Sequence, residues 1–584
     1  MATQAPISDD NFVPDDRSVN DDKNGPAVDA KPQPLNVEEE FSKDAQFGVQ
    51  RVEATAMVWS KSHLIAAYCI IWLIYVVISL QEVIVRTYSP FVTSTFSKHS
   101  LTAVVGIISS IVSGMSKLPL AKVLDTWGRP QGLALTLFVW VMGIVMMAGC
   151  RNVETYCAAN VFSTVGAQGT SYCLTVFVSD TTTLRNRSLM LALATTPYIF
   201  TTWSAGPIAN KILRGPGWRW GFGMWAIITP FVVLPLVLLF MWNQRKAEKQ
   251  GLLKNQSSIR NMTPRKVLQY AIDVDLFGIL LLAGGMALFL LPFSIYSYQA
   301  LRFRSPMIIC MIVFGALLVA SFVVWEKFFA PVTFIPFRLL RDRTVFFGGI
   351  MFTFVFFCSA VWGSYFTSML LVAYNQGVDR TTYISNIYRT GSCFFAIPMA
   401  YFIRWTGRFK PLALYFLLPL MLLGVSLMIP FRHPDADIGL VVMTQIFVAF
   451  AGGPIVLCGE MAMMAPSDHQ HIAVIIAILD LFGSVGTALG STIAAAIWTG
   501  TFRDAIIRHA PPTLKVDLVY NNMYSQLANR WGTPERRAIA LAYADSQRYM
   551  LITSACILVP AFVAVALWRN IDLRTIKQTR GRVI

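Results

Sequence analysis

The sequence has few charged residues. Asp, Glu, Lys and Arg make up 14% of its 584 residues, against about 25% in soluble globular proteins, while hydrophobic residues make up 55%. A mean hydropathy of +0.55 over this length excludes a set of water-soluble domains. The sequence also lacks the strict alternation of apolar and polar residues that a membrane β-barrel requires. It therefore predicts an all-α integral membrane protein.

Motifs that would indicate an enzyme or a metalloprotein are also missing. There is no Cys-x-x-Cys pair, and the nine cysteines and six histidines are not grouped at the spacing of metal ligands. The Walker motif GxxxxGK[ST] is absent, so ATP is not expected to drive any activity. No long basic stretch accounts for the net charge of +16, which is expected to flank membrane spans and not to bind nucleic acid. We therefore expect no enzyme activity, no metal site and no cofactor.

What the sequence does contain is a series of long apolar runs. A helix that crosses the hydrocarbon core needs about 20 mostly apolar residues, because a helix satisfies its own backbone polar groups there. Fourteen runs meet this description: 62–84, 101–120, 131–149, 156–178, 188–208, 221–241, 275–293, 306–325, 345–372, 382–403, 411–430, 438–464, 472–499 and 549–568. The N-terminus lacks the basic and then apolar pattern of a cleaved signal peptide, so the first run is expected to direct insertion.

The distribution of Lys and Arg predicts the orientation in the membrane. An even number of spans puts both termini on one side, and cytoplasmic loops carry an excess of Lys and Arg. With the acidic N-terminal region inside, the inner loops and C-terminal tail carry 23 bases and the outer loops carry 17. We therefore expect both termini in the cytoplasm, and we favour the plasma membrane over endosomal vesicles.

These features divide the chain into six predicted parts. They are a disordered acidic tail (1–60), a six-helix half (61–241), a basic cytoplasmic linker (242–274), two inserted helices (275–325), a second six-helix half (326–568) and a basic C-terminal tail (569–584). Within the second half, the predicted extracellular loop 500–548 has periodic apolar and aromatic residues. We expect this loop to form short amphipathic helices over the outer face.

An internal repeat supports the division into halves. Residues 125–135 read DTWGRPQGLAL and residues 404–414 read RWTGRFKPLAL, which aligns Gly128-Arg129 with Gly407-Arg408. Each copy joins two predicted spans on the cytoplasmic side, and the copies lie nearly half a chain apart. Two parallel six-helix halves with two extra helices between them give this spacing, and transporters built from such halves bind substrate near the midplane.

The first copy has a physical rationale as a gate. Gly128 allows a tight turn, Asp125 can accept hydrogen bonds from helix N-terminal amides, and Arg129 can bridge to a carboxylate on a neighbouring helix. Such a cluster holds the cytoplasmic face shut and breaks on switching. The alternative is a plain turn with topogenic charge. The second copy, with Gly407 and Arg408, carries Arg404 where the first has its aspartate, so an asymmetric gate is expected.

The segment LDTWGRP resembles the helix 2–3 loop motif of the major facilitator superfamily. Three further segments resemble the fungal siderophore–iron transporters of that superfamily: GVQRVEATAMVWS (48–60), SDTTTLRNRS (179–188) and LLVAYNQGVDRTTYISNIY (370–388). The resemblance implies a fourteen-helix major facilitator fold. It also implies import of ferric siderophores, with hydroxamates as the family-level expectation, by proton symport. A siderophore already chelates its iron fully, so no iron ligands from the protein are expected.

Charged residues inside predicted spans are candidates for substrate binding or proton coupling, because each costs about 2.5–3.5 kcal/mol on insertion scales. Glu82 and Arg86 share a face of the first helix, as a proton or substrate site or as an interfacial pair. Asp480 is either a protonatable site or a structural hydrogen-bonding group. Glu460 is a further candidate for proton coupling, or its carboxylate only extends to the membrane interface. Arg389 is expected to attract an anionic substrate or to pair with a helix-1 carboxylate.

Other candidates are polar or aromatic. Tyr383, Asn386 and Tyr388 near Arg389 suit a bulky hydrogen-bonding ligand, although such residues also serve packing. The loop between the fourth and fifth spans is expected to form a cytoplasmic latch, or to be plain topogenic charge, with Asp180, Arg185 and Arg187. Loop aromatics are expected either to cap the ligand or to pack among themselves: Tyr520, Tyr524, Trp531, Tyr543 and Tyr549.

The resulting hypothesis is a proton-coupled importer of ferric siderophore that works by alternating access, with Glu82 or Asp480 as the proton carrier. Two alternatives remain open at this point. The first is a proton-driven exporter of toxins or drugs on the same fold. The second is a membrane sensor that transports nothing.

Overall fold

The computed structural model describes residues 58–96, 102–250, 268–269, 272, 275–296, 299, 301–331, 340–467 and 472–574. Within these ranges the regular secondary structure is helical throughout, and no strand occurs. The predicted tail 1–60 lies outside them except for its last three residues. Most of the linker 242–274 also lies outside, although the helix before it continues to Lys249.

The helices fall into three groups along the chain. The first group is α2 (Lys61–Thr95), α3 (Thr102–Thr126), α4 (Arg129–Gly149), α5 (Val153–Thr181), α6 (Leu184–Ala194), α7 (Pro197–Arg214) and α8 (Trp218–Lys249). The second is α10 (Leu276–Leu290), α11 (Pro292–Ile295), the short helix η3 (Arg302–Arg304) and α12 (Pro306–Phe328).

The third group begins at Arg343. It is α14 (Arg343–Gly363), α15 (Phe366–Val372), α16 (Val378–Thr406), α17 (Lys410–Leu412), the π-helical turn η4 (Ala413–Leu417), α18 (Leu418–Phe431), α19 (Ile438–Met464), α20 (Ile472–His509), α21 (Val516–Asn521), α22 (Met523–Ala528), α23 (Pro534–Ile557) and α24 (Val559–Ala566).

Local sequence sets many of the helix starts and breaks. The side chains of Ser60, Asn152 and Asp437 cap the starts of α2, α5 and α19 by accepting a backbone N–H. Pro197 lies at the start of α7, where its missing N–H is tolerated, and so the predicted span 188–208 is two helices, α6 and α7.

The outer surface of the bundle is apolar. Large side chains such as Phe231 (82% exposed) and Phe138 (66% exposed) point outward, as expected for a protein whose solvent is lipid. Among the described residues, ten helical segments are long and apolar enough to cross a membrane. The predicted spans outside this set are 156–178, 188–208, 275–293 and 382–403. These four lie in helices that are shorter or more polar, so the count of fourteen stays a prediction.

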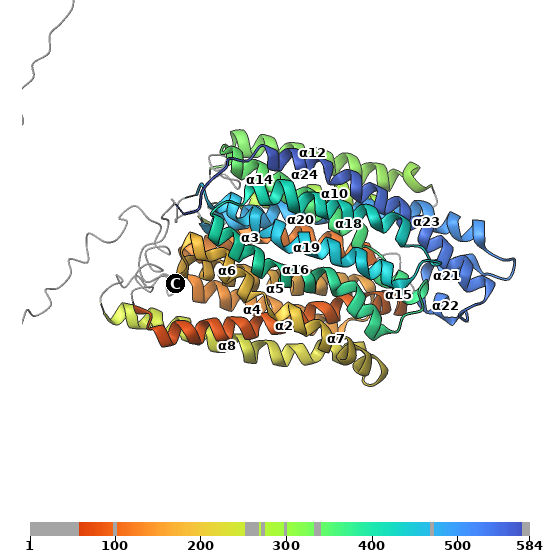
Figure 1. The fold of residues 1–584 in the computed structure, drawn as a ribbon, viewed down its shortest axis with the longest axis horizontal. Coiled ribbons are helices and arrows are strands. Elements are labelled where there is room, and N and C mark those ends of the chain that lie inside the picture. The colour runs from red at the N-terminus through yellow and green to blue at the C-terminus, as the bar shows by residue number, and fades with distance from the viewer. Residues whose placement is uncertain are drawn as a thin grey trace, which may run out of the picture. The chain divides into compact units, whose positions relative to one another are not determined.

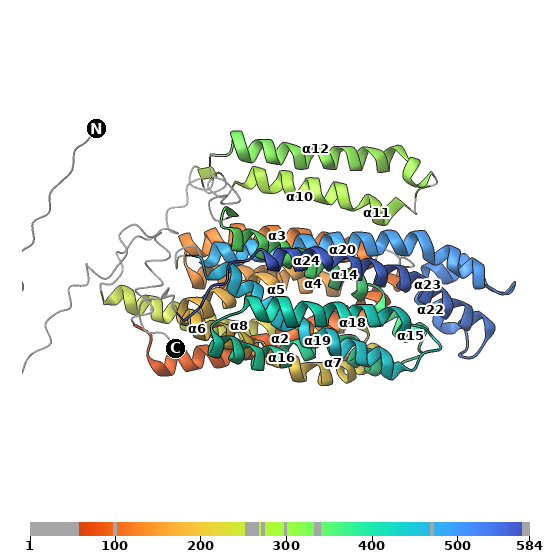
Figure 2. The same ribbon diagram turned by 45° about the horizontal axis from the view of Figure 1, so that its top comes forward.

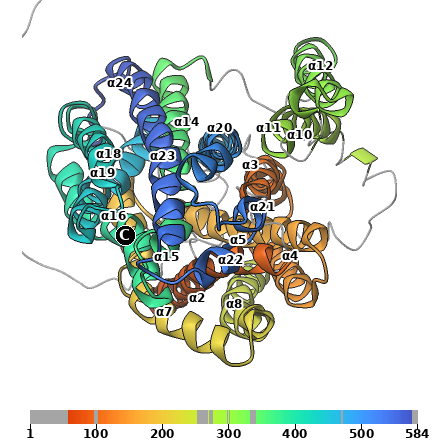
Figure 3. The same ribbon diagram turned by 90° about the vertical axis from the view of Figure 1, so that its right-hand side faces the viewer.

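Figure 1 shows the long helices running side by side along one axis, and Figure 3 views them end-on. Helices of the first group contact helices of the third along two seams, α3 against α20 and α7 against α16. The α10–α12 pair stands at the edge of the bundle, with α10 against α3 (Figure 2). Contacts join Lys43–Ile584 into one unit, so the division into two halves stays a prediction.

The α3–α20 seam is unusually close. A Cβ atom at Gly114 would lie 2.3 Å from Cβ of Ser484, so only glycine lets the two helices approach this far. The α3–α4 turn at Gly128 and the α16–α17 turn at Gly407 lie at one end of the bundle, which we call the GR end. The opposite end, which carries α21 and α22, we call the cap end.

Candidate functional site

A charge cluster joins the first and third helix groups in the half of the bundle nearer the cap end. Arg389 on α16 donates to Oε1 of Glu82 on α2 at 2.5 Å, and Arg86 lies 3.5 Å from the same oxygen. The guanidinium of Arg389 also stacks over the ring of Tyr198, 4.7 Å from its centroid. The expected pairing of Arg389 with a helix-1 carboxylate is present. Two cations surround one carboxylate, so the cluster has a net positive charge.

The three residues predicted to surround Arg389 have separate contacts. The hydroxyl of Tyr383 donates to the carbonyl of Trp203 on α7 at 3.2 Å. Asn386 is buried and donates to the carbonyl of Thr382 on its own helix at 2.8 Å. The ring of Tyr388 packs edge-on against Trp362 with a centroid distance of 5.2 Å. These contacts support the packing alternative more than a single ligand-binding face.

A second charge cluster lies nearer the GR end, across the α3–α20 seam. Nζ of Lys117 lies 2.9 Å from Oδ2 of Asp480, with 7% and 30% of the two side chains exposed. Glu460 on α19 has a buried Oε2 that finds no hydrogen-bond partner among the described residues. Both carboxylates are predicted from the sequence, but Lys117 is not. A lysine inside the apolar run 101–120 was the available signal, because such a charge needs a partner in a membrane.

The first GR turn is locked by a buried ion pair. Nε of Arg129 lies 3.1 Å from Oδ2 of Asp180 at the end of α5, with 10% and 6% of the side chains exposed. Gly128 has φ +112°, a conformation that a residue with a side chain rarely adopts. The predicted bridge from the motif arginine to a carboxylate on another helix is therefore present. The side chain of Asp125 lies outside the described residues.

Arg185 and Arg187, which were predicted to form one latch, lie in different environments. Arg187 is fully buried, donates to the carbonyl of Ser179 at 3.1 Å and contacts the sulfur of Met464 on α19. Arg185 instead lies on the surface. Residues two positions apart face different sides of a helix, which explains the separation. Arg187 thus connects the first helix group to the third, whereas Arg185 does not share the Asp180 pair.

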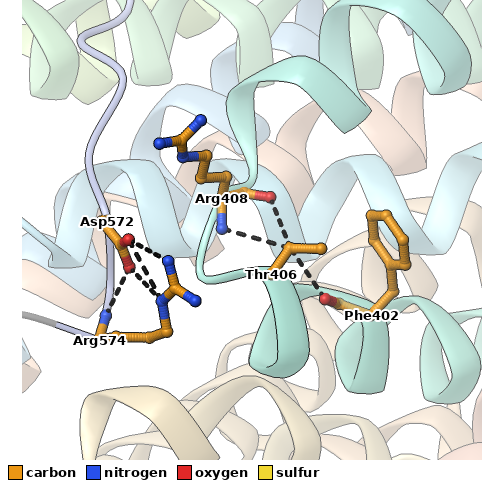
Figure 4. Close-up of polar contacts among 5 residues, drawn as sticks. All are labelled: Phe402, Thr406, Arg408, Asp572 and Arg574. Carbon is orange, nitrogen blue, oxygen red and sulfur yellow. Dashed lines mark hydrogen bonds and ion pairs between the residues drawn. The ribbon is translucent and has the colours of Figure 1, made fainter.

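The second GR turn is built differently from the first. Gly407 ends α16 with φ +71°, and its carbonyl accepts the backbone N–H of Leu573 at 2.9 Å. Beside it, Asp572 binds Arg574, with 2.6 Å from Nη2 to Oδ2 (Figure 4). Because of that hydrogen bond, the pKa of Asp572 falls to about 2. Arg408 is exposed, so the two turns are asymmetric, as the missing aspartate in the second copy indicated.

The chain segment after α24 is pinned to the same turn. Nζ of Lys410 donates to the carbonyls of Ala566 and Trp568 at 2.9 and 2.7 Å. Trp568 is buried with its ring 5.9 Å from that of Phe409. No local pattern indicates this contact, because the partners are about 160 residues apart in the sequence.

The predicted loop 500–548 is largely helical. The preceding span, predicted at 472–499, continues as α20 to His509, and α23 begins already at Pro534. Between them lie α21 and α22, which confirms the expectation of short helices. Arg536, 2% exposed, donates from its Nε to the carbonyl of Val372 at 2.9 Å and from its Nη1 to that of Gln526 at 2.5 Å.

The five loop aromatics do not form one surface. Tyr520 on α21 and Tyr543 on α23 are buried, and both rings contact that of Phe502 near the end of α20. Tyr524 contacts the ring of Phe91 near the end of α2, with centroids 5.8 Å apart. Trp531 and Tyr549 are each 54% exposed. Packing within the loop therefore accounts for two of the five, and Tyr524 joins the loop to the first helix group.

No group of His, Cys, Asp and Glu that could hold a metal ion occurs among the residues that the structure describes. The site contains ion pairs between helices. Two clusters lie at different depths, one joining α2 to α16 and the other joining α3 to α20. Both join a helix of the first group to a helix of the third group.

Comparisons with known proteins identify this architecture. A family model described as Major Facilitator Superfamily matches residues 71–491. The human organic anion transporter MFSD10 aligns with a TM-score of 0.50 and 11% identity, covering 84% of this chain and 98% of that one. The POT family transporter PepTSo aligns with a TM-score of 0.50 and 13% identity, covering 86% and 97%. Likeness at this identity shows the fold alone. The chain is an all-α integral membrane protein of the Major Facilitator Superfamily.

Curated relatives narrow the family. The chain is 47% identical over 554 residues to MFS siderochrome iron transporter 1 of Ajellomyces capsulatus, covering 94% of each. It is 40% identical over 546 residues to MFS siderochrome iron transporter D of Aspergillus fumigatus, covering 92% of this chain and 90% of that one. It is 35% identical over 547 residues to siderophore iron transporter mirB of Emericella nidulans, covering 93% and 90%. The chain belongs to this family of fungal MFS siderochrome iron transporters, which are not enzymes.

Proposed function

We propose that this protein imports ferric siderophore, of the hydroxamate type, across the plasma membrane by proton-coupled alternating access. The observation that carries the substrate class is the 47% identity over 94% of the chain to a protein named a siderochrome iron transporter. In this proposal both termini and the GR end face the cytoplasm, and the cap end faces outward. The first and third helix groups act as two halves that rock about the seams between them.

The cluster around Glu82 is proposed to bind substrate and to close the outer side. Two arginines share one carboxylate, so the cluster offers a net positive charge to the polar, oxygen-rich surface of an iron chelate. When the outer side opens, the bond from Arg389 to Glu82 must break, since it joins α2 to α16. A substrate oxygen that replaces Glu82 at Arg389 then supplies part of the energy for opening.

The second cluster is proposed to couple transport to protons. Glu82 and Asp480 are the carriers that the sequence suggests, and each has a cationic partner within 3.5 Å. Glu460 instead has a buried carboxyl oxygen without a partner among the described residues. A buried carboxyl group of this kind is expected to carry a proton. We therefore assign the exchangeable proton first to Glu460, with the Lys117–Asp480 pair as its charged neighbour.

Uptake of a radiolabelled ferric hydroxamate siderophore tests this function. Cells that express the chain are compared with cells that do not, each with and without a protonophore. Net uptake that the protonophore abolishes supports the proposal. Uptake that persists with the protonophore contradicts proton coupling but not substrate class. Resistance to a toxin without any uptake indicates an exporter, and the absence of both activities indicates a sensor.

A further inference from the structure

A surface cavity at the GR end lies outside the two charge clusters and the gate. Its volume is about 220 Å³, and Arg185, Tyr401, Arg404 and Trp405 line it. Arg185 comes from the second residue of α6, and the other three come from the last two turns of α16. The cavity is smaller than the roughly 300–1,000 Å³ of typical drug-sized sites, so it suits a headgroup more than a whole substrate.

The polar lining of this cavity is cationic. Two arginines line it, and no aspartate or glutamate from the described part of the chain is among its lining residues. Neither Arg185 nor Arg404 makes an ion pair or a side-chain hydrogen bond within the part of the chain that the structure describes. Guanidinium groups bind phosphate oxygens in a bidentate manner, so two of them with open donors favour a phosphate-bearing anion.

The aromatic lining places the cavity at the edge of the membrane. Tyr401 and Trp405 are 64% and 70% exposed, and on the same helix Phe394 and Phe402 also point outward. Outward-facing apolar side chains on a membrane helix contact lipid, and Tyr and Trp gather at the level of the headgroups. The cavity thus opens toward lipid headgroups. We propose that it binds the phosphate of an anionic phospholipid and not free phosphate from solution.

The position of the cavity allows a bound lipid to connect the first and third helix groups. One wall belongs to α6 of the first helix group and the other to α16 of the third, and these two helices pack together. A headgroup held by both arginines therefore bridges the two groups while the GR end is closed. That leaflet is the cytoplasmic one in the proposed orientation, where anionic lipids are enriched. Lipid binding itself does not depend on the transport proposal.

The test is lipid binding by the purified full-length protein in nanodiscs. Phosphatidylserine is titrated into phosphatidylcholine nanodiscs, and bound lipid is counted by native mass spectrometry. The double substitution Arg185→Gln/Arg404→Gln removes two charges and is expected to weaken phosphatidylserine binding about 30-fold. Arg245→Gln removes an exposed arginine on α8 that does not line the cavity, and it is expected to bind as the wild type does.

Two results overturn the proposal. One is equal phosphatidylserine binding by the wild type and the double variant. The other is displacement of the lipid by millimolar inorganic phosphate, which would make the site one for free phosphate. If the double variant is not monodisperse, the single variant Arg404→Gln is used, with an expected loss of about fivefold. This test measures lipid binding and not siderophore uptake. A negative result would therefore contradict the lipid site without contradicting the proposed function.

Discussion

In the Lys117–Asp480 pair, we expect removal of one of the two charges to lower the free energy of unfolding far more than removal of the other. The ammonium and carboxylate lie 2.9 Å apart, but the lysine side chain is 7% exposed and the aspartate side chain 30%. Asp480→Asn leaves a nearly buried ammonium without its counter-charge, and such losses cost about 3–5 kcal/mol. Lys117→Met leaves a carboxylate that reaches solvent, so its cost is expected near 1 kcal/mol.

Unfolding of the purified protein by SDS measures these free energies in a double-mutant cycle. The double variant Lys117→Met/Asp480→Asn is expected to be more stable than Asp480→Asn alone, because no ammonium remains unpaired. Lys122→Met, on the same helix, is the matched control and is expected to change stability by less than about 0.5 kcal/mol. Equal losses in the two single variants, or a double variant as unstable as the sum of both, would refute the reasoning.

Three other residues can be tested by transport, binding and NMR measurements. Glu460→Gln is expected to abolish protonophore-sensitive accumulation of ferric siderophore while counter-exchange of labelled substrate persists; accumulation equal to that of the wild type rules out Glu460 as the carrier. Arg389→Lys keeps the charge beside Glu82 but loses the planar fork, so we expect the apparent substrate affinity to fall about tenfold with expression unchanged, whereas wild-type affinity in Arg389→Gln contradicts a substrate role. The folded-state pKa of Asp572 lies near 2, below its ordinary value of 3.8, so its contact with Arg574 stabilises the docked segment above pH 3.8 and is lost as the pH falls through about 2. The NMR amide signal of Leu573 should therefore be unchanged between pH 7 and 5, and a change within that window contradicts the assignment.

Much of this fold could be predicted because the membrane imposes strict rules. A helix or a pair of helices lies at each predicted apolar run, and both copies of the repeated Gly-Arg pair mark a turn at the GR end. The ends of helices were less predictable, since hydropathy reports where lipid begins and not where hydrogen bonding ends. Thus α20 runs ten residues beyond the predicted span 472–499, to His509.

Side-chain partners were predictable only where chemistry demanded one. The motif arginine Arg129 needs a carboxylate nearby, but the sequence analysis grouped Asp180 with Arg185 and Arg187 and did not name it as the partner of Arg129. Lys117 was missed because a single lysine does not disturb the apolar character of its run. The role of Lys410, which holds the carbonyls of Ala566 and Trp568, depends on a packing arrangement that no local pattern encodes.

Arg536 links the loop helices at the cap end to the neighbouring helices by hydrogen bonds. Because its guanidinium, on α23, binds the carbonyls of Val372 at the end of α15 and Gln526 on α22, we expect α22 to move together with α15 and α23 when it separates from Phe91. We expect these helices to move as a rigid body, without local unfolding. Amide hydrogen exchange in residues 516–528 should therefore remain slow even in protein that is turning over substrate, and fast exchange there would show that the entrance unfolds to admit its cargo.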